Sequence, residues 1–260
     1  MASTGLVSPP PFVRLAAHPV RWRLLTQLAG SDLRVRELVA LVRKPQNLVS
    51  YHLRLLRLDG LVTARRSSAD ARDSYYRLDL DRCAHALKSS GAALHPALLA
   101  ASPGATSSVE IRQLSRVSVL FACTGNSARS PIAEALLRDR NDDRVEVASA
   151  GSDPKPRLHP HAVRVLDERY GIDLAKQLPR HLDTFAGRQF DYIITLCDKV
   201  REVCLDLGDA SHRVHWSIPD PAAATVDDQP DYSEFVRTAA EIDNRVRHLI
   251  TKLALKEAQP

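Results

Sequence analysis

The chain has 260 residues, of which 44% are hydrophobic and 26% are charged, with 16 prolines and 10 glycines. This composition can bury a sizeable core, which excludes a wholly disordered chain or a fibrous repeat. The net charge of +5 is unevenly distributed, because residues 1–110 carry 15 Lys and Arg against 8 Asp and Glu, whereas residues 111–260 carry 21 against 23. We therefore expect two domains that meet different partners.

Neither a membrane segment nor a disulfide framework is predicted. No apolar run approaches the roughly 18 residues that a membrane span requires, and the first residues lack the features of a secretory signal. We expect a cytoplasmic protein with no membrane partner. The four cysteines, Cys83, Cys123, Cys197 and Cys204, are too few for a disulfide scaffold at this length, so each is either a buried filler or a reactive thiol.

Residues 1–101 are predicted to form a mainly helical domain. Apolar periodicity and β-propensity predict three short helices, a hairpin and a final helix, over residues 20–28, 35–42, 48–58, 61–66 with 74–78, and 81–100. The periodicity stops among the small and turn-forming residues that follow, which predicts a linker over residues 102–115.

Residues 116–260 show a different pattern, in which strands and helices alternate. The expected strands cover residues 117–122, 145–148, 192–196 and 213–216, and the expected helices cover 131–138, 159–170 and 233–255. This order predicts an α/β domain with a parallel sheet flanked by helices.

The first domain resembles the ArsR-type winged-helix repressors across residues 12–80, through LAAHPVR (15–21), SYHLRLL (50–56) and GLV (60–62). In a winged helix-turn-helix, the second helix enters the major groove with its first residues at base edges. The resemblance therefore implies binding to operator DNA through a recognition helix and a wing, with contacts from Gln46, Asn47, Ser50, Tyr51, His52, Arg54, Arg65 and Arg66. It also implies a homodimer formed through the first and last helices. The alternative is a helical dimerisation module with exposed arginines.

The arsenic-sensing site of that family is missing from the expected position. The best-known sensors carry a Cys-x-Cys pair before the recognition helix, whereas this chain has Arg34 and Arg36 there. Arginine cannot bind As(III), and Cys83 with His85 makes too small a ligand set for a metal. We predict no metal site and a lost or relocated sensor.

A loop at residues 119–131, VLFACTGNSARSP, carries the strongest chemical signal. A loop that runs from a strand to a helix N-terminus directs backbone N–H groups and the helix dipole at an anion. We expect Cys123 to be a nucleophile whose pKa this field lowers, Gly125 to allow a tight turn, Arg129 to bind two anion oxygens and Ser130 to cap the helix. The oxyanion would be bound by Thr124, Gly125, Asn126, Ser127, Ala128, Arg129 and Ser130.

This loop resembles that of the low-molecular-weight phosphotyrosine phosphatase superfamily, which includes one class of arsenate reductases, and the resemblance covers residues 116–255. It implies that Asp220 is the general acid. Cys197 and Cys204 match the cysteine pair of the thioredoxin-coupled reductases in position and separation. By that resemblance, arsenate binds Cys123, Cys197 attacks Cys123, and Cys204 attacks Cys197 to leave a disulfide. No bound cofactor is implied, only external thioredoxin or another thiol.

Other features of the sequence leave alternatives open. The segment after Asp220 lacks the tyrosines that are usual in the phosphatases, whereas the Ser130-Pro131 helix start is more typical of a phosphatase. Some reductases hold a potassium ion with Asn, Glu, Ser and Asp; Asn126, Glu134 and Ser149 match, but the region of the Asp reads Pro179-Arg180-His181 here. We predict a DNA-binding regulator fused to an arsenate reductase. The alternatives are a fused phosphotyrosine phosphatase and a repressor that senses an oxyanion without catalysis.

Overall fold

The computed structural model describes residues 8–95, 98, 117–141, 145–203, 210–223, 225–226 and 229–256. The chain divides into two compact units, Met1–Ile111 and Arg112–Pro260. The linker predicted over residues 102–115 lies outside the described residues. Each unit is described by itself below.

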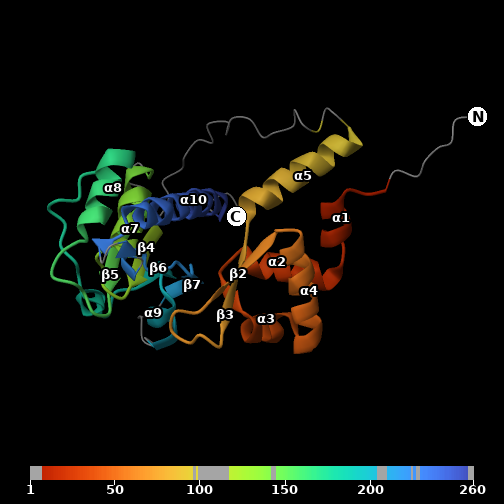
Figure 1. The fold of residues 1–260 in the computed structure, drawn as a ribbon, viewed down its shortest axis with the longest axis horizontal. Coiled ribbons are helices and arrows are strands. Elements are labelled where there is room, and N and C mark those ends of the chain that lie inside the picture. Colours follow the sequence, from red (N-terminus) through yellow and green to blue (C-terminus); the bar gives the residue numbers. More distant parts are fainter. Residues whose placement is uncertain are drawn as a thin grey trace, which may run out of the picture. The chain divides into compact units, whose positions relative to one another are not determined.

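The first unit has the predicted succession of helices and hairpin, with two additions (Figure 1). Its elements are α1 (Pro11–Ala16), α2 (Pro19–Leu28), β1 (Leu33–Arg34), α3 (Val35–Val42), α4 (Gln46–Leu58), β2 (Val62–Arg66), β3 (Ser74–Leu78) and α5 (Leu80–Leu94). The sequence did not predict α1 or β1, which are short. The imidazole of His18 accepts a hydrogen bond from the backbone N–H of Val20 and caps α2, which begins at Pro19.

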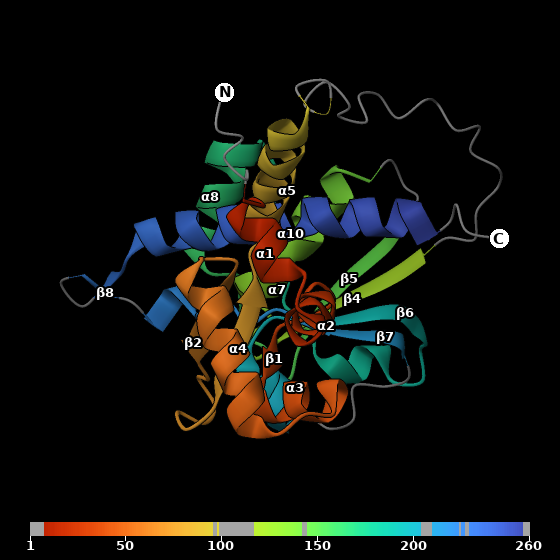
Figure 2. The same ribbon diagram turned by 90° about the vertical axis from the view of Figure 1, so that its right-hand side faces the viewer.

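The core of the first unit lies where α2, α3 and α4 contact one another (Figure 2). Leu24, Leu38 and Leu56 are fully buried there, one from each helix. The strands form a small antiparallel sheet in the order β1-β3-β2, and β1 pairs with β3 through Leu33 opposite Tyr76. This arrangement is a helix-turn-helix followed by a β-hairpin wing.

The second unit is built on a four-stranded parallel sheet, as the alternating pattern predicted. The strand order is β5-β4-β6-β7. The strands are β4 (Val117–Cys123), β5 (Val145–Gly151), β6 (Phe190–Thr195) and β7 (Ala210–His215), and a short pair, β8 (Thr225–Val226) and β9 (Gln229–Pro230), lies outside this sheet. The helices are α7 (Arg129–Asp139), α8 (Pro160–Tyr170), α9 (Asp198–Val203) and α10 (Tyr232–Lys256), with 3-10 turns at η1 (Leu182–Phe185) and η2 (Pro221–Ala223).

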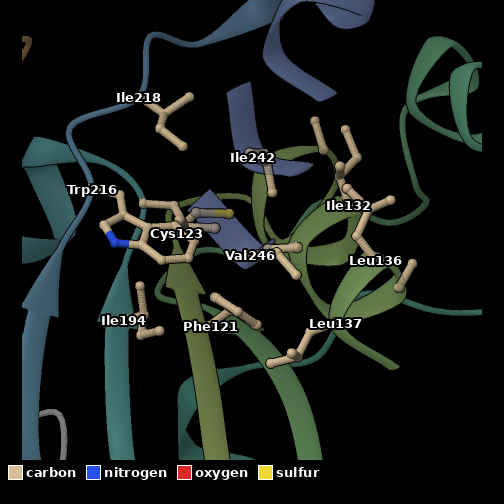
Figure 3. Close-up of a cluster of buried hydrophobic side chains, with 14 of the residues drawn as sticks. Phe121, Cys123, Ile132, Leu136, Leu137, Ile194, Trp216, Ile218, Ile242 and Val246 are labelled. Carbon is tan, nitrogen blue, oxygen red and sulfur yellow. The ribbon is translucent and has the colours of Figure 1, made fainter. Parts of the chain in front are cut away.

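Both faces of this sheet are buried, which explains the continuous apolar run of β4. Phe121 belongs to the large core cluster that includes residues of α7, α8 and α10, whereas Leu120 and Ile193 belong to a smaller cluster of apolar residues. Figure 3 shows Cys123 among buried side chains of the large cluster, which also includes Trp216 and Ile218. The end of β4 therefore places Cys123 among the buried apolar residues of this unit.

Two further observations concern the helices. The sequence did not predict α9, the short helix between Cys197 and Cys204. Among the described residues, no helix is both long and apolar enough to cross a membrane.

Candidate active site and nucleic-acid interface

The anion loop connects the carboxyl end of β4 to the start of α7, at the edge where open parallel sheets place their ligand sites. Its backbone differs from the expectation in two ways. Asn126, not Gly125, adopts the left-handed conformation, with φ of 42°. Ser130 does not cap α7. The helix begins at Arg129, so Ser130 is its second residue, and the N-cap residue, Ala128, makes no side-chain hydrogen bond. The side chains of Asn126 and Ser130 instead form hydrogen bonds inside the site.

Gly151, at the end of β5, packs directly against the backbone of the anion loop. A Cβ atom on this glycine would lie 2.4 Å from the carbonyl oxygen of Thr124 and 2.9 Å from the backbone nitrogen of Asn126. No side chain fits in that space, so the loop packs directly on the strand. The sequence pattern gave no sign of this requirement.

Cys123 is almost fully buried, with 2% of its surface exposed. Its Sγ lies 2.9 Å from Ser130 Oγ. Burial raises the pKa of the Cys123 thiol and Cys197 raises it further, while Arg129 and the hydrogen bonds to Ser130 lower it. The predicted lowering of this pKa is therefore wrong, because the loss of solvation of the thiolate outweighs the neighbouring positive charge.

Arg129 and Asp220 lie together beside the cysteine. The Arg129 guanidinium donates to the backbone carbonyl of Ile218 at 3.1 Å and to Asp220 Oδ2 at 3.0 Å. The arginine side chain is 8% exposed and the aspartate side chain 49% exposed, so the carboxyl group lies on the solvent side of the pair. The structure thus brings together the predicted anion ligand and the predicted acid.

Cys197 lies against the same loop, two residues after the end of β6. Its Sγ is 3.3 Å from Thr124 Oγ1, and the residue is 2% exposed. The following residue, Asp198, begins α9 and is held by Ser217 Oγ at 2.6 Å and His215 Nε2 at 3.1 Å. Cys204, the third predicted redox residue, lies outside the described residues.

Two residues near the loop were missed by sequence reasoning. The backbone N–H of Lys155 donates to the carbonyl of Gly125 at 2.9 Å, and that of His159 donates to the carbonyl of Ser127 at 2.8 Å. The His159 ring stacks on Phe235, and burial lowers its pKa, as does His161, while Asp220 raises it. The sequence positions of Lys155 and His159 do not indicate that they reach the anion loop, because the chain segment after β5 brings them to it.

The oxygen atoms of Glu134 and Asn126, which would coordinate a monovalent cation, accept hydrogen bonds from N–H donors. Arg180 bonds both oxygens of Glu134, at 2.7 and 2.6 Å, and Gln177 Nε2 donates to Glu134 Oε2 at 2.8 Å. The backbone N–H of Arg180 donates to Asn126 Oδ1 at 2.7 Å. These residues do not fit a potassium ion. Among the described residues, no group of three His, Cys, Asp or Glu could hold a metal.

In the first unit, α4 presents a polar face to solvent. The exposed residues include Gln46, Asn47, Ser50, Tyr51 and Arg54, and Arg66 is exposed on the wing strand β2, where Arg65 is partly buried. His52 differs from this set, because it is 3% exposed and its ring packs at a tilt against that of His18, with ring centroids 4.3 Å apart. We therefore remove His52 from the expected DNA contacts, since the buried side of α4 carries its ring.

Arg34 and Arg36, at the position expected for sensing cysteines, join the start of α3 to the wing. Both approach Asp73 Oδ2, at 3.5 and 3.1 Å respectively. Asp73 immediately precedes β3. Cys83 lies half-buried on α5, where burial and Asp79 raise its pKa to about 11, so it is not an activated thiol.

The geometry described above defines a phosphatase-like α/β unit together with a winged helix-turn-helix. Residues 118–259 match the family model described as low molecular weight phosphotyrosine protein phosphatase, and residues 18–64 match that of the arsR family of bacterial regulatory proteins. The chain belongs to the low molecular weight phosphotyrosine protein phosphatase family, and it carries an ArsR-type DNA-binding motif ahead of that domain.

Relatives of the second unit carry two different names. An arsenate reductase of Halalkalibacterium halodurans is 34% identical over 129 residues, which is 50% of this chain and 91% of the relative. A solved arsenate reductase of Archaeoglobus fulgidus is 34% identical, with a TM-score of 0.42 over 51% of this chain and 98% of the other. A solved low molecular weight protein tyrosine phosphatase of T. tengcongensis is 26% identical, with a TM-score of 0.44 over 52% and 99%.

Proposed function

We propose that the chain is an arsenic-resistance protein in which a DNA-binding transcriptional regulator, residues 1–101, is fused to an arsenate reductase, residues 116–260. The observation that carries the reductase is the contact between Thr124 Oγ1 of the anion loop and the second thiol, Cys197, at 3.3 Å. Phosphate hydrolysis needs the loop, its nucleophile and an acid, but it needs no second thiol. The names of the relatives that match the second unit support the same choice.

In this proposal, the loop amides and Arg129 bind arsenate, with residues 124–130 forming the cradle. Cys123 Sγ forms a bond to arsenic(V) while one As–O bond breaks, and Asp220 supplies a proton to the oxygen that leaves as water. Bound arsenate, with several basic oxygens, can accept the proton of the Cys123 thiol. The raised pKa of that thiol in the free protein is therefore compatible with attack in the complex.

The reduction requires two electrons, which the thiol pair supplies. Cys197 attacks Cys123 Sγ, a disulfide forms, and the S–As bond breaks with its electron pair left on arsenic, so that arsenite leaves. Cys204 then attacks Cys197, which frees Cys123 and leaves a Cys197–Cys204 disulfide for thioredoxin or a small thiol to reduce. The role of Cys204 rests on the sequence. This chemistry needs a reducing compartment, so we propose that the protein acts in the cytoplasm.

The test of the relay is Cys197→Ser. Arsenate-dependent oxidation of thioredoxin should be lost in this variant and in Cys123→Ser, whereas hydrolysis of para-nitrophenyl phosphate, where present, should survive only in Cys197→Ser. Arsenate reduction that continues without Cys197 would contradict the relay. A Leu178→Ala variant at an exposed position serves as the matched control.

A phosphatase is the second candidate, favoured by Asp220, whose carboxylate lies 3.0 Å from Arg129. Efficient hydrolysis of a phosphotyrosine peptide by the wild type, with no arsenate turnover under any thiol donor, would support it in place of the reductase. A wild type with neither activity, but with DNA affinity that changes on addition of arsenate, would indicate an oxyanion-sensing repressor.

For the first unit, we propose operator binding through the exposed face of α4 and the wing. The residues expected at DNA are Gln46, Asn47, Ser50, Tyr51, Arg54, Arg65 and Arg66. We also propose a homodimer through the first and last helices of this unit, α1 and α5, since Val13 of α1 and Leu87 and Leu94 of α5 are exposed apolar residues. Light scattering should report a dimer for the wild type and a monomer for Leu87→Glu combined with Leu94→Glu. A dimer in that variant would contradict this interface.

A further inference from the structure

A buried carboxylate lies behind the anion loop. The Glu134 side chain is 1% exposed and projects from α7 toward Ser149 of β5 and the segment that contains Arg180. A buried carboxylate without a counter-charge is costly, because it loses its hydration. Arg180 approaches both of its oxygens at 2.6 to 2.7 Å, while Arg138 bonds one oxygen from a more exposed position. The charge of Glu134 is therefore balanced inside the chain.

Arg180 is fixed from its backbone as well as from its guanidinium. Its N–H donates to Asn126 Oδ1 at 2.7 Å, and its carbonyl accepts from the N–H of Gly151 at 2.9 Å. His181, the next residue, forms an isolated parallel bridge with Gly151. The arginine is thus held between the anion loop and the end of β5.

The hydrogen bonds from Glu134 to Cys123 have one consistent direction. A carboxylate only accepts, so the Ser149 hydroxyl donates to Glu134 Oε2 at 2.6 Å. Ser149 Oγ then accepts from Asn126 Nδ2 at 2.8 Å, and the same amide nitrogen donates to Ser130 Oγ at 2.9 Å. The Ser130 hydroxyl retains its own hydrogen, which it can donate to Cys123 Sγ, 2.9 Å away, when the sulfur is a thiolate. The chain of donors ends on the sulfur and favours its thiolate form.

We propose that Arg180 is a built-in counter-cation of Glu134 that, through Ser149, Asn126 and Ser130, positions the hydroxyl donor at Cys123 and makes the site independent of alkali-metal ions. Arg180 is a positioning residue, since it touches Glu134 and Asn126 and not the sulfur. The proposal rests on the proposed role of Cys123 as the nucleophile. It explains why the oxygens that would ligate a cation are all paired with N–H donors.

The test measures the rate at which iodoacetamide alkylates Cys123 in the full chain, read by mass spectrometry of the peptide that contains it. Potassium chloride is compared with choline chloride at equal concentration. The wild type should give the same rate in both salts. Arg180→Ala should react about three- to tenfold more slowly in choline chloride, because the hydroxyl donor at Cys123 is then less firmly positioned, and potassium should restore part of the rate.

Two variants make the result specific. Arg180→Lys keeps a positive charge and should retain most of the wild-type rate in choline chloride. Arg164→Gln removes an equal charge from an exposed pair with Glu168 on α8 and should leave the rate unchanged. A wild-type rate that rises in potassium, or an Arg180→Ala rate equal to wild type in choline, would overturn the proposal. If Arg180→Ala does not fold, the wild-type salt comparison and Arg180→Lys still decide.

The readout does not require arsenate. A chain that shows the predicted alkylation pattern but never reduces arsenate contradicts the proposed function and leaves the role of Arg180 intact. A chain that reduces arsenate but needs potassium for Cys123 reactivity contradicts the role of Arg180 alone.

Discussion

Two functional arginines, one from each unit, have opposite environments. On α4, Arg54 is exposed, whereas Arg129 in the second unit has 8% of its side chain exposed and meets a carboxylate and a carbonyl. Exposed charges act through a screened field, so they suit a polyanion whose affinity depends on salt. A buried guanidinium has fixed donors and suits one small anion. Burial, more than residue type, decides which anion each unit can bind.

The largest expected effect follows from removing the buried guanidinium. Arg129→Gln should reduce arsenate turnover by about 10²- to 10³-fold, because it removes a charged donor from the place where negative charge develops. Steady-state kinetics with arsenate and a thiol donor measure this loss. DNA affinity should stay at the wild-type value, and equal losses of both activities would show that the two units do not act separately.

A smaller effect is expected when an exposed arginine of the first unit is removed. Arg54→Gln should weaken binding to the chain's own promoter DNA about three- to tenfold and lower the slope of log affinity against log salt by about one. Fluorescence anisotropy over a salt series measures both quantities. Arg164→Gln, an exposed arginine of the second unit, is the control, and a similar loss there would point to non-specific attraction.

The backbone contact below the anion loop gives a prediction on stability. Gly151→Ala should lower the free energy of unfolding by about 1–3 kcal/mol, because the added methyl group meets the backbone of Thr124 and Asn126. Gly30→Ala in the first unit, where the new Cβ meets only an ordinary contact at 3.5 Å, should change it by less than about 0.5 kcal/mol. Denaturant melts compare the two, and equal effects would contradict the close approach at Gly151.

The smallest effect concerns the acidity of Cys123. Its pKa is raised by burial, so in the free protein it should be mostly protonated at pH 7, and alkylation should accelerate as the pH rises through and beyond the ordinary thiol range. Ser130→Ala removes a group that lowers this pKa, so the midpoint should move further upward. Cys83, with a pKa of about 11, supplies the reference in the first unit. A Cys123 midpoint below the ordinary thiol value would contradict the dominant role of burial.

Sequence reasoning succeeded where a pattern is local. Apolar periodicity predicted the main helices and the alternation of strands and helices, because burial on one face or on both faces determines the spacing of apolar residues. It failed for β1 and α9, which are too short to show a period, and for the caps of the loop. The position of His52 was missed because a helix carries polar residues on its buried face as well, and only the packing against His18 reveals this one.

The sequence by itself determined the chemistry that each unit contains: a polar recognition helix with a wing, and a cysteine loop with an arginine, an acid and further thiols. Only the tertiary structure decided how these groups interact. It buried Cys123, put Cys197 against Thr124, placed Arg180 on Glu134 and tied Arg36 to Asp73. Local spacing fixes which faces a segment presents, but burial and charge pairing depend on residues far apart in the chain.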